Sequence, residues 1–368
     1  MRVVQINAAI DAHGRAPEEL LQAWPTVPLV AEAVALAGAE VTVLQASRQA
    51  AALERHGVRY RFVAEPRLAT GNGPGLLPWR LAAEARALRP DAIHFNGLDY
   101  PLHLAWICRA GAPVLVQDHA SKPGGKRAAL RRPALRRVAG VAFTAEAQAE
   151  PWRRSGELPA DVPVFAIPES STLFTPGDRD EARHEARIHG DPALLWVGRL
   201  DANKDPLTIL RAVRAASARL PGLQLWMAYG ESELLPEIER ALRSDAELAA
   251  RVHLLGTVPH ASMEALYRAA DLFVLGSHRE GSGYALIEAL ACGVTPVVSD
   301  IPSFRALTGD GAVGALAPCG DAEAFADRIV ALAARPQRAA VLDHFARQLS
   351  PEAVGRQLVA AYRAIARS

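Results

Sequence analysis

Short apolar runs recur along this chain with helical stretches between them, and this alternation restricts the possible folds more than any other feature. The runs of the first half are Val3–Ile6, Val41–Leu44, Ala92–Phe95, Val114–Val116, Val141–Phe143 and Val164–Ile167. Those of the second half are Leu194–Val197, Leu223–Met227, Val252–Leu254, Leu272–Leu275 and Thr295–Val298. Strand–helix–strand repeats at this spacing predict parallel sheets that are covered by helices.

The length of 368 residues is enough for two domains with separate cores. Turn-forming residues with little periodicity occupy Pro168–Asp180, which indicates a boundary between domains. We expect one α/β domain over residues 1–170, a second over 171–350, and a closing helix over 351–368 that packs back on the first. Two Rossmann-like, doubly wound domains facing across a cleft would bind ligands at the carboxyl ends of their strands.

Composition excludes several classes of protein. Half of the residues are hydrophobic and 22% are charged, which is typical of a folded chain, and a net charge of +1 argues against wholesale binding of nucleic acid. The three cysteines are far apart and form no CxxC pair, which suggests a reducing compartment. We find neither a signal-peptide pattern nor an apolar run of the roughly 20 residues that a membrane span needs. These features predict a cytoplasmic protein.

Residues Glu280–Asp300 have the pattern of an anion-binding site. A carboxylate precedes a Gly-Ser-Gly turn, a helix opens directly after the turn, and an apolar strand closes the unit. A helix that begins on glycines presents backbone N–H groups and a positive dipole end to a phosphate. Glu288, about one turn into this helix, would reach a ribose, and Glu280 would face the group beyond the phosphate. The alternative is a surface loop followed by a glutamate that favours the helix start.

Two cations follow a strand in the segment Val197–Pro206. Arg199 and Lys204 lie on the loop between a strand that ends at Gly198 and a helix that begins near Pro206. An arginine can bind phosphate oxygens in a bidentate manner and a lysine acts as a point charge, so the two would clamp a diphosphate. The alternative is a solvated loop with two ordinary surface cations. Ser277, at the end of another strand, would serve the same phosphate pocket or cap a turn.

The C-terminal half is similar to a known family. The strings GRLDANKDP and LLGTVPHASMEALYRAADLFVLGSHREGSGYALIEALACGVTPVVSD resemble the signature of the family-4 retaining glycosyltransferases of the GT-B fold. This resemblance covers nearly the whole C-terminal half. It implies two Rossmann-like domains, of which the second mainly holds a nucleotide-sugar donor and the first mainly holds an acceptor.

The resemblance also implies roles for single residues. Arg199 and Lys204 would neutralise the diphosphate leaving group, and Glu288 would bind the ribose hydroxyls. Glu280 would hold the transferred sugar near its anomeric carbon. The remaining donor-site positions are Gly281, Ser282, Gly283 and Tyr284 as backbone contacts to phosphate, Gly230 after the second strand of the domain, and Val258 beside the base.

The N-terminal half departs from the family pattern in two places. The glycine pair that the family carries after its first strand is replaced by Asn7–Arg15, in which only Gly14 is available. The family's Pro-Asn-Gly turn after the domain junction is replaced by Pro168-Glu169-Ser170. Glu169 would either touch the acceptor or only repair a local turn.

Candidate residues of the acceptor side also follow predicted strands. His119 matches the position of the family's active-site histidine, with a purely structural histidine as the alternative. Asp118 would orient the ring of His119. Asn96 and Gly97, at the carboxyl end of another strand, would line the acceptor side.

The segment Lys122–Arg137 carries seven cations in sixteen residues. One interpretation is a basic surface that meets anionic lipids or a charged acceptor, with the protein peripheral at a membrane; the other is a solvated helix face. The triplet Asp178-Arg179-Asp180 resembles a metal-binding DxD motif, but it lies in the predicted boundary between the domains. The first strand does not lead into the GxGxxG motif that binds a nicotinamide cofactor. We therefore expect no metal and no cofactor besides the nucleotide sugar as co-substrate.

These observations predict a retaining hexosyltransferase that moves a sugar from a nucleoside diphosphate to an acceptor hydroxyl. Because cations and helix-start amides would neutralise the diphosphate, no divalent metal is required. The segment Val258–His260 offers no carboxylate to guanine N–H groups, which favours UDP over GDP. The alternatives are a sugar-nucleotide epimerase or hydrolase of the same fold and a non-catalytic nucleotide-sugar-binding protein. The sequence names neither the sugar nor the acceptor.

Overall fold

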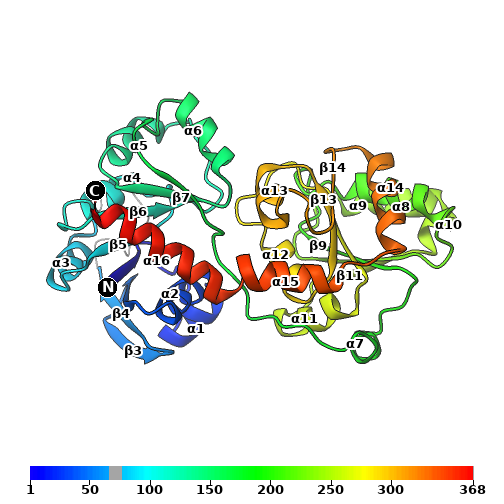
Figure 1. The fold of residues 1–368 in the computed structure, drawn as a ribbon, viewed down its shortest axis with the longest axis horizontal. Helices are drawn as coiled ribbons and strands as arrows, with labels where there is room; N and C mark the ends of the chain where they lie inside the picture. Colours follow the sequence, from blue (N-terminus) through cyan, green and yellow to red (C-terminus); the bar gives the residue numbers. More distant parts are fainter. Residues whose placement is uncertain (66–76, 368) are drawn as a thin grey trace. The chain divides into compact units, whose positions relative to one another are not determined.

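The computed structural model describes residues 1–65 and 77–367. The chain forms two compact units, unit 1 of Met1–Ser171 with Pro351–Ser368 and unit 2 of Thr172–Ser350. Each unit contains one β-sheet with helices packed against it (Figure 1). Every strand that was predicted from an apolar run is present, so the α/β, doubly wound class is confirmed.

The sheet of unit 1 has the strand order β3-β4-β2-β1-β5-β6-β7-β8 and is parallel except for the β3–β4 pair. Its strands are β1 (Arg2–Asn7), β2 (Glu40–Ser47), β3 (Ala51–Arg55), β4 (Val58–Ala64), β5 (Ala92–Asn96), β6 (Val114–Gln117), β7 (Gly140–Phe143) and β8 (Val164–Ala166). The central strands are buried on both faces, which explains why their sequences are continuous apolar runs.

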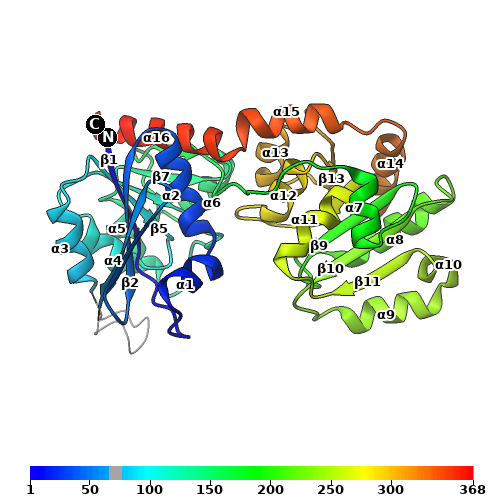
Figure 2. The ribbon, with the colours of Figure 1, turned by 90° about the horizontal axis from the view of Figure 1, so that it is seen from below.

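Helices cover both faces of this sheet and form two separate apolar cores. One core includes side chains of α1 (Pro17–Ala23), α2 (Thr26–Leu36) and α16 (Pro351–Arg367). The other includes α3 (Trp79–Ala87), α4 (Pro101–Ile107), α5 (Ala128–Leu135) and α6 (Glu150–Arg154), and a short 3-10 turn (Glu146–Ala149) precedes α6. The C-terminal helix α16 lies beside α2 (Figure 2), where Gly355 permits a close approach because a Cβ there would lie 1.9 Å from the carbonyl oxygen of Ala33.

Unit 2 has a fully parallel sheet in the order β11-β10-β9-β12-β13-β14. Its strands are β9 (Ala193–Gly198), β10 (Gln224–Tyr229), β11 (Val252–Gly256), β12 (Leu272–Leu275), β13 (Thr295–Ser299) and β14 (Ala315–Ala317). Its helices are α7 (Arg179–Ala186), α8 (Pro206–Ser217), α9 (Leu235–Ser244), α10 (Ala246–Ala249), α11 (His260–Ala269), α12 (Tyr284–Ala291), α13 (Pro302–Thr308), α14 (Ala322–Ala333) and α15 (Arg338–Gln348). Helix α8 contacts α14 and α7 contacts α11, around one continuous core.

Three strands lie outside the predicted runs, namely β3, β4 and β14. The β3–β4 hairpin turns at His56 and Gly57, which both have positive φ, as a two-residue hairpin loop requires. In β4 the buried Val58, Tyr60 and Phe62 alternate with exposed arginines, a period of two that marks a half-buried strand rather than an apolar run. The three-residue β14 is too short to give a pattern.

None of the helices in the described ranges is long and apolar enough to cross a bilayer.

Candidate functional site

The candidate donor residues of unit 2 lie on loops that leave the carboxyl ends of β9, β10, β11 and β12, with Tyr284 and Glu288 on the helix α12 that follows the β12 loop. Parallel strands bring these ends to one edge of the sheet, where ligands of such folds bind. Backbone hydrogen bonds join the loops: Leu200 N–H donates to the carbonyl of Glu231, and His278 N–H donates to the carbonyl of Asn203, at 2.8 Å each. The Asn203 side chain also donates to the carbonyl of Arg279 at 2.9 Å.

Lys204 and Glu280 form an ion pair at this edge. The Nζ atom of Lys204 lies 2.5 Å from Oε1 of Glu280, and the two side chains are only 15% and 12% exposed. The loop that carries Lys204 is shaped by Asp201, whose side chain accepts a hydrogen bond from the Lys204 N–H at 2.9 Å. Two residues from different predicted motifs, 76 positions apart, are thus brought into direct contact.

The helix after Lys204 begins where the sequence predicted. Asp205 is the N-cap of α8, with its side chain accepting from Thr208 N–H, and Pro206 is the first helical residue. A Cβ at Gly276, just after β12, would lie 3.1 Å from the carbonyl oxygen of Asp205. Glycine there lets the β9 and β12 loops approach each other closely.

Arg199 is half exposed and is also matched by carboxylates. Its Nη2 lies 2.9 Å from Asp201 Oδ2, and its Nε lies 3.9 Å from Glu231 Oε2. Both predicted cations therefore lie beside negative charge in the absence of a ligand. A diphosphate at this edge would compete with or join these carboxylates for the same N–H donors.

Gly283 is required at the start of α12 for a steric reason. Its φ of +64° is in the left-handed region, and a Cβ would lie 2.7 Å from Cδ1 of Leu307. The Gly-Ser-Gly turn thus leads directly into the helix at Tyr284, so the N–H groups of the first helical turn face the same loop as Glu280. Gly230, after β10, has no described atom within 4 Å of the place a Cβ would occupy.

Glu288 is buried on α12 and bound by two side chains of α11. Tyr267 OH donates to its Oε2 at 2.9 Å, and His260 Nε2 lies 3.0 Å from its Oε1. Burial raises the pKa of Glu288, and the hydrogen bonds from His260 and Tyr267 oppose that rise. The ring of His260 is exposed and stacks on Phe174 with centroids 5.0 Å apart.

Sequence analysis missed Tyr267 and Phe174, and it considered His260 only beside the base. Nothing in the local sequence identifies these residues as part of a site, because a tyrosine on the inner face of an amphipathic helix is typical of a core residue. Val258 packs partly buried against the core of unit 2 at the end of β11. Ser277 is fully buried, and its hydroxyl has no hydrogen-bond partner within residues 1–65 and 77–367, so it caps no turn there.

In unit 1, His119 is held by Glu169. His119 follows β6 and Glu169 follows β8, and His119 Nδ1 lies 2.5 Å from Glu169 Oε1. The expectation that Asp118 orients the ring is wrong, because Asp118 turns to the backbone N–H of Ser121 at 3.0 Å instead. The Asp118 carboxylate closes this local turn, and burial raises the pKa of Asp118 to about 6.

Gly97 and Asn96 also lie at this edge of unit 1. A Cβ on Gly97, which has a φ of +91°, would lie 3.9 Å from Cδ2 of His119, so the two loops are neighbours. Asn96 Oδ1 lies 3.1 Å from Nε2 of the buried His94 ring. Because His94 is fully buried, its pKa falls to about 4 and its ring is neutral at physiological pH.

A pocket of about 540 Å³ opens beside the loop that follows β1. Its lining includes Asp11, Gly14, Arg15, Arg48 and Gln49. The loop is braced by Asp11, which accepts from both the backbone and the guanidinium of Arg15 at 2.7 and 2.6 Å. The loop that departs from the family's double glycine therefore forms the wall of a pocket that has both polar and apolar lining residues.

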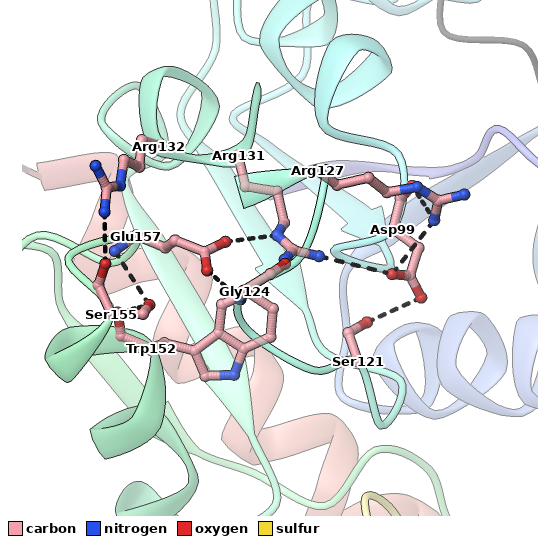
Figure 3. A network of polar contacts seen from close by, with 9 residues as sticks. All are labelled: Asp99, Ser121, Gly124, Arg127, Arg131, Arg132, Trp152, Ser155 and Glu157. Carbon is pink, nitrogen blue, oxygen red and sulfur yellow. Dashed lines mark hydrogen bonds and ion pairs between the residues drawn. The ribbon is translucent and has the colours of Figure 1, made fainter. Parts of the chain in front are cut away.

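The basic segment Lys122–Arg137 is neither a bare basic surface nor a wholly solvated helix face (Figure 3). Arg131 is buried, with its Nε 2.6 Å from Glu157 Oε2 and its guanidinium 5.0 Å from the ring centroid of Trp152. Arg127 contacts Asp99, and Arg132 donates to the carbonyl of Ser155 at 2.8 Å. The exposed cations without a role in this network are Lys122, Lys126, Arg136 and Arg137.

The DxD-like triplet has a structural explanation. Asp178 is the N-cap of α7, and its side chain accepts from the N–H groups of Asp180 and Glu181 at 2.9 Å each. Among the residues with described positions, no group of three or more metal-binding side chains is present.

We expect replacement of Tyr267 by phenylalanine to destabilise unit 2. The substitution leaves a buried Glu288 oxygen without its donor, which costs about 1–3 kcal/mol. Urea denaturation monitored by tryptophan fluorescence measures the loss. Tyr229→Phe is the matched control, because no described hydrogen bond involves the Tyr229 hydroxyl. An equal loss in both variants would contradict a specific role for the Tyr267–Glu288 bond.

Two family models match successive parts of the chain. The model described as Glycosyltransferase Family 4 matches residues 27–165, and the model described as Glycosyl transferases group 1 matches residues 178–349. The first match lies in unit 1 and the second in unit 2.

Curated relatives carry the same kind of name. The D-inositol 3-phosphate glycosyltransferase of Segniliparus rotundus is 32% identical over 53% of this chain and 45% of its own length. The protein of that name from Mycobacterium tuberculosis is 29% identical over 69% of this chain and 58% of its own length. The chain thus spans about half the length of the curated relatives it matches.

Solved structures show the same fold at low sequence identity. Sucrose-phosphate synthase from Thermosynechococcus elongatus has a TM-score of 0.68 at 20% identity and covers 99% of both chains. A glycosyltransferase from Rickettsia africae has a TM-score of 0.71 at 13% identity, over 99% of this chain and 98% of its own. The HepE protein of Anabaena in complex with UDP has a TM-score of 0.68 at 16% identity, and the match covers 99% of this chain and 100% of its own. From the two matching models and this shared fold, we conclude that the chain belongs to the family-4 glycosyltransferases of the GT-B fold.

Proposed function

We propose that this chain is a retaining glycosyltransferase that transfers a sugar from a nucleoside-diphosphate donor to an acceptor hydroxyl. Unit 2 binds the donor and unit 1 binds the acceptor. The observation that carries the proposal is the Lys204–Glu280 pair beside the glycine-led start of α12. It combines, at one edge of one sheet, a cation for a diphosphate, a carboxylate for a sugar hydroxyl, and helix-start amides for phosphate oxygens.

The chemical difficulty is the departure of a diphosphate while positive charge develops on the sugar. Lys204 Nζ has three N–H donors, so it can keep its bond to Glu280 and still bind a phosphate oxygen. Arg199, which is half exposed, can turn from its surface carboxylates to the diphosphate. Fixed donors of this kind stabilise charge that develops in the transition state, and losing one typically costs about 3 kcal/mol of barrier.

Glu288 is the candidate ribose ligand, but in this structure its oxygens are already bound by His260 and Tyr267. The His260 bond is the exchangeable one, because that ring is 64% exposed and Tyr267 is fully buried. A ribose hydroxyl would take the place of the His260 Nε2 atom. Uridine is the proposed base, because the His260 segment offers no carboxylate to guanine.

The proposal requires no divalent metal and no covalent intermediate. Lys204, Arg199 and the amides of α12 provide the positive charge that a metal would otherwise supply. Glu280 is tied to Lys204, which makes it a hydrogen-bond acceptor for the sugar rather than a nucleophile. The leaving phosphate itself would take the acceptor's proton on the face from which it departs, so the anomeric configuration is retained.

An anionic acceptor is favoured by the pocket beside the β1 loop of unit 1. Arg48 and Arg15, which is paired with Asp11, line a space of about 540 Å³, which is enough for a phosphorylated polyol or sugar. The curated relatives named above are D-inositol 3-phosphate glycosyltransferases, and their name fits the same chemistry. We propose an acceptor that carries a phosphate group.

Donor binding is tested first with single substitutions. We expect Lys204→Ala to lower kcat/KM about a hundredfold, because one diphosphate contact of about 3 kcal/mol is lost. Glu288→Ala should weaken UDP binding in calorimetry. Lys126→Ala, an exposed lysine of unit 1, is the control and should leave both values unchanged. Wild-type turnover and UDP affinity in both site variants would refute the assignment.

The course of the reaction is tested by following the product. We expect NMR of the product formed from a UDP-α-sugar to show an α-linkage, and turnover to persist in excess EDTA. A β-linked product would overturn the retaining mechanism. Loss of activity in EDTA with recovery on Mg²⁺ would overturn metal independence, and tighter binding of GDP than of UDP would reverse the base assignment. Release of free sugar with every acceptor offered would indicate a hydrolase.

The acceptor proposal is tested with inositol 3-phosphate and unphosphorylated inositol as a matched pair. We expect the phosphorylated compound to raise the melting temperature of the protein and the neutral one to have little effect, since a bound ligand stabilises by mass action. Arg48→Ala should abolish the shift, and Arg136→Ala, an exposed arginine outside the pocket, should keep it. Equal shifts with both compounds would contradict an anionic acceptor.

A further inference from the structure

His119 and Glu169 form a side-chain pair that the function described so far does not require. The strands that precede them, β6 and β8, are separated in the sheet by β7. The loop that carries Glu169 is nevertheless fastened to the end of β6. The buried side-chain amide of Gln117 donates to the backbone carbonyl of Glu169 at 3.0 Å and to that of Pro168 at 3.4 Å. This attachment brings the Glu169 carboxylate to the ring of His119.

The geometry decides which ring nitrogen carries the bound hydrogen. A carboxylate is an acceptor, so His119 Nδ1 at 2.5 Å from Glu169 Oε1 must be the donor. The Glu169 side chain is 10% exposed, so water competes little for this bond. The other nitrogen, Nε2, has no hydrogen-bond partner within the ranges that the structure describes. The ring is therefore fixed on one side, while the nitrogen on its other side is a buried polar atom without a partner.

The charges around His119 favour its protonated form. Burial opposes a charged ring, but the hydrogen bond and the charge of Glu169 outweigh it, with smaller contributions from Asp118 and Asp99, so the pKa of His119 is raised. His94 also faces this ring, but its own low pKa leaves it neutral. A protonated His119 presents Nε2–H as a donor, whereas a neutral ring held at Nδ1 presents Nε2 as an acceptor.

We propose that Glu169 is a positioning residue that holds His119 so that its Nε2–H donates to an oxygen atom of the substrate bound to unit 1. Glu169 does not touch the substrate itself. Its carboxylate fixes the ring orientation and keeps the proton on the ring while the substrate binds. The inference rests on the proposed function for its substrate, but the His119–Glu169 pair can be tested without any transfer activity.

The first test measures the protonation of His119 directly. Ring ¹H–¹³C NMR spectra of the whole chain are recorded against pH for the wild type and for Glu169→Gln, with His119→Gln used to assign the signal. Because an adjacent opposite charge shifts a pKa by about 1–3 units, we expect the His119 titration to move at least about one pH unit lower in Glu169→Gln. An unchanged titration would overturn the proposal whether or not the protein transfers sugar.

The second test asks whether the positioned proton matters to the reaction. In the wild type, the imidazolium is present below its raised pKa and is lost as pH rises through it, so kcat/KM should fall on the alkaline side. In Glu169→Gln this fall should begin at lower pH, with activity recovering on acidification. In His119→Gln activity should be low at every pH. Glu150→Gln, an exposed carboxylate of the same unit, is the control and should keep the wild-type profile.

A conservative variant separates positioning from folding. Glu169→Asp keeps the charge on a shorter side chain, so we expect it to retain a raised His119 titration and most of the activity. If Glu169→Gln does not fold, the His119 titration of the wild type decides the question, because a pKa that is not raised above 6.5 would overturn the proposal. A wild-type pH profile in Glu169→Gln, with the His119 titration shifted, would show that the proton is not used and would overturn the proposal. The assignment as a glycosyltransferase would survive that result, because it rests on unit 2.

Discussion

The contact between Lys204 and Glu280 is the interaction on which the candidate donor site depends. Each residue lies on a loop after a parallel strand. Parallel pairing of β9 with β12 brings the two loops to one sheet edge, and the backbone hydrogen bond from His278 to Asn203 joins them there. The ion pair is buried enough that water screens it weakly. Contacts of this kind hold charged groups in fixed positions, where they can stabilise the charge that develops in a transition state.

The charged side chains at this edge lie beside side chains of opposite charge or hydrogen-bond donors. Lys204 and Arg199 each lie beside carboxylates, and Glu288 lies between two donors. An unmatched lysine or glutamate in so enclosed a place would be costly, and the group would lose its charge instead. The same pairing holds the side chains in place, so a nucleotide sugar would exchange partners with them.

In unit 1, too, a charged candidate residue is held by a side chain of opposite charge. The candidate residues of this unit also follow the carboxyl ends of parallel strands, but they form a histidine–carboxylate pair in place of a lysine–carboxylate pair. Glu169, the departure from the family pattern after the domain junction, supplies the carboxylate of that pair. In the basic segment after β6, Arg131 is buried against Glu157 (Figure 3), so this cation stabilises the unit instead of adding to a basic surface.

The sequence by itself determined the alternating architecture, the sheet strands that are apolar throughout, and the loops that carry the candidate residues. These follow from local signals, namely apolar runs, helix-start glycines and prolines, and the position of a loop after a strand. Tertiary structure alone decided the partners: Glu169 rather than Asp118 for His119, Tyr267 and His260 for Glu288, and Glu157 for Arg131. Such pairs join residues tens of positions apart through side-chain directions that depend on sheet order and loop packing. No local sequence pattern predicts those directions. The Asp118 carboxylate closes a turn and the Glu169 carboxylate holds the His119 ring, yet nothing in the sequence around either residue distinguishes the two roles.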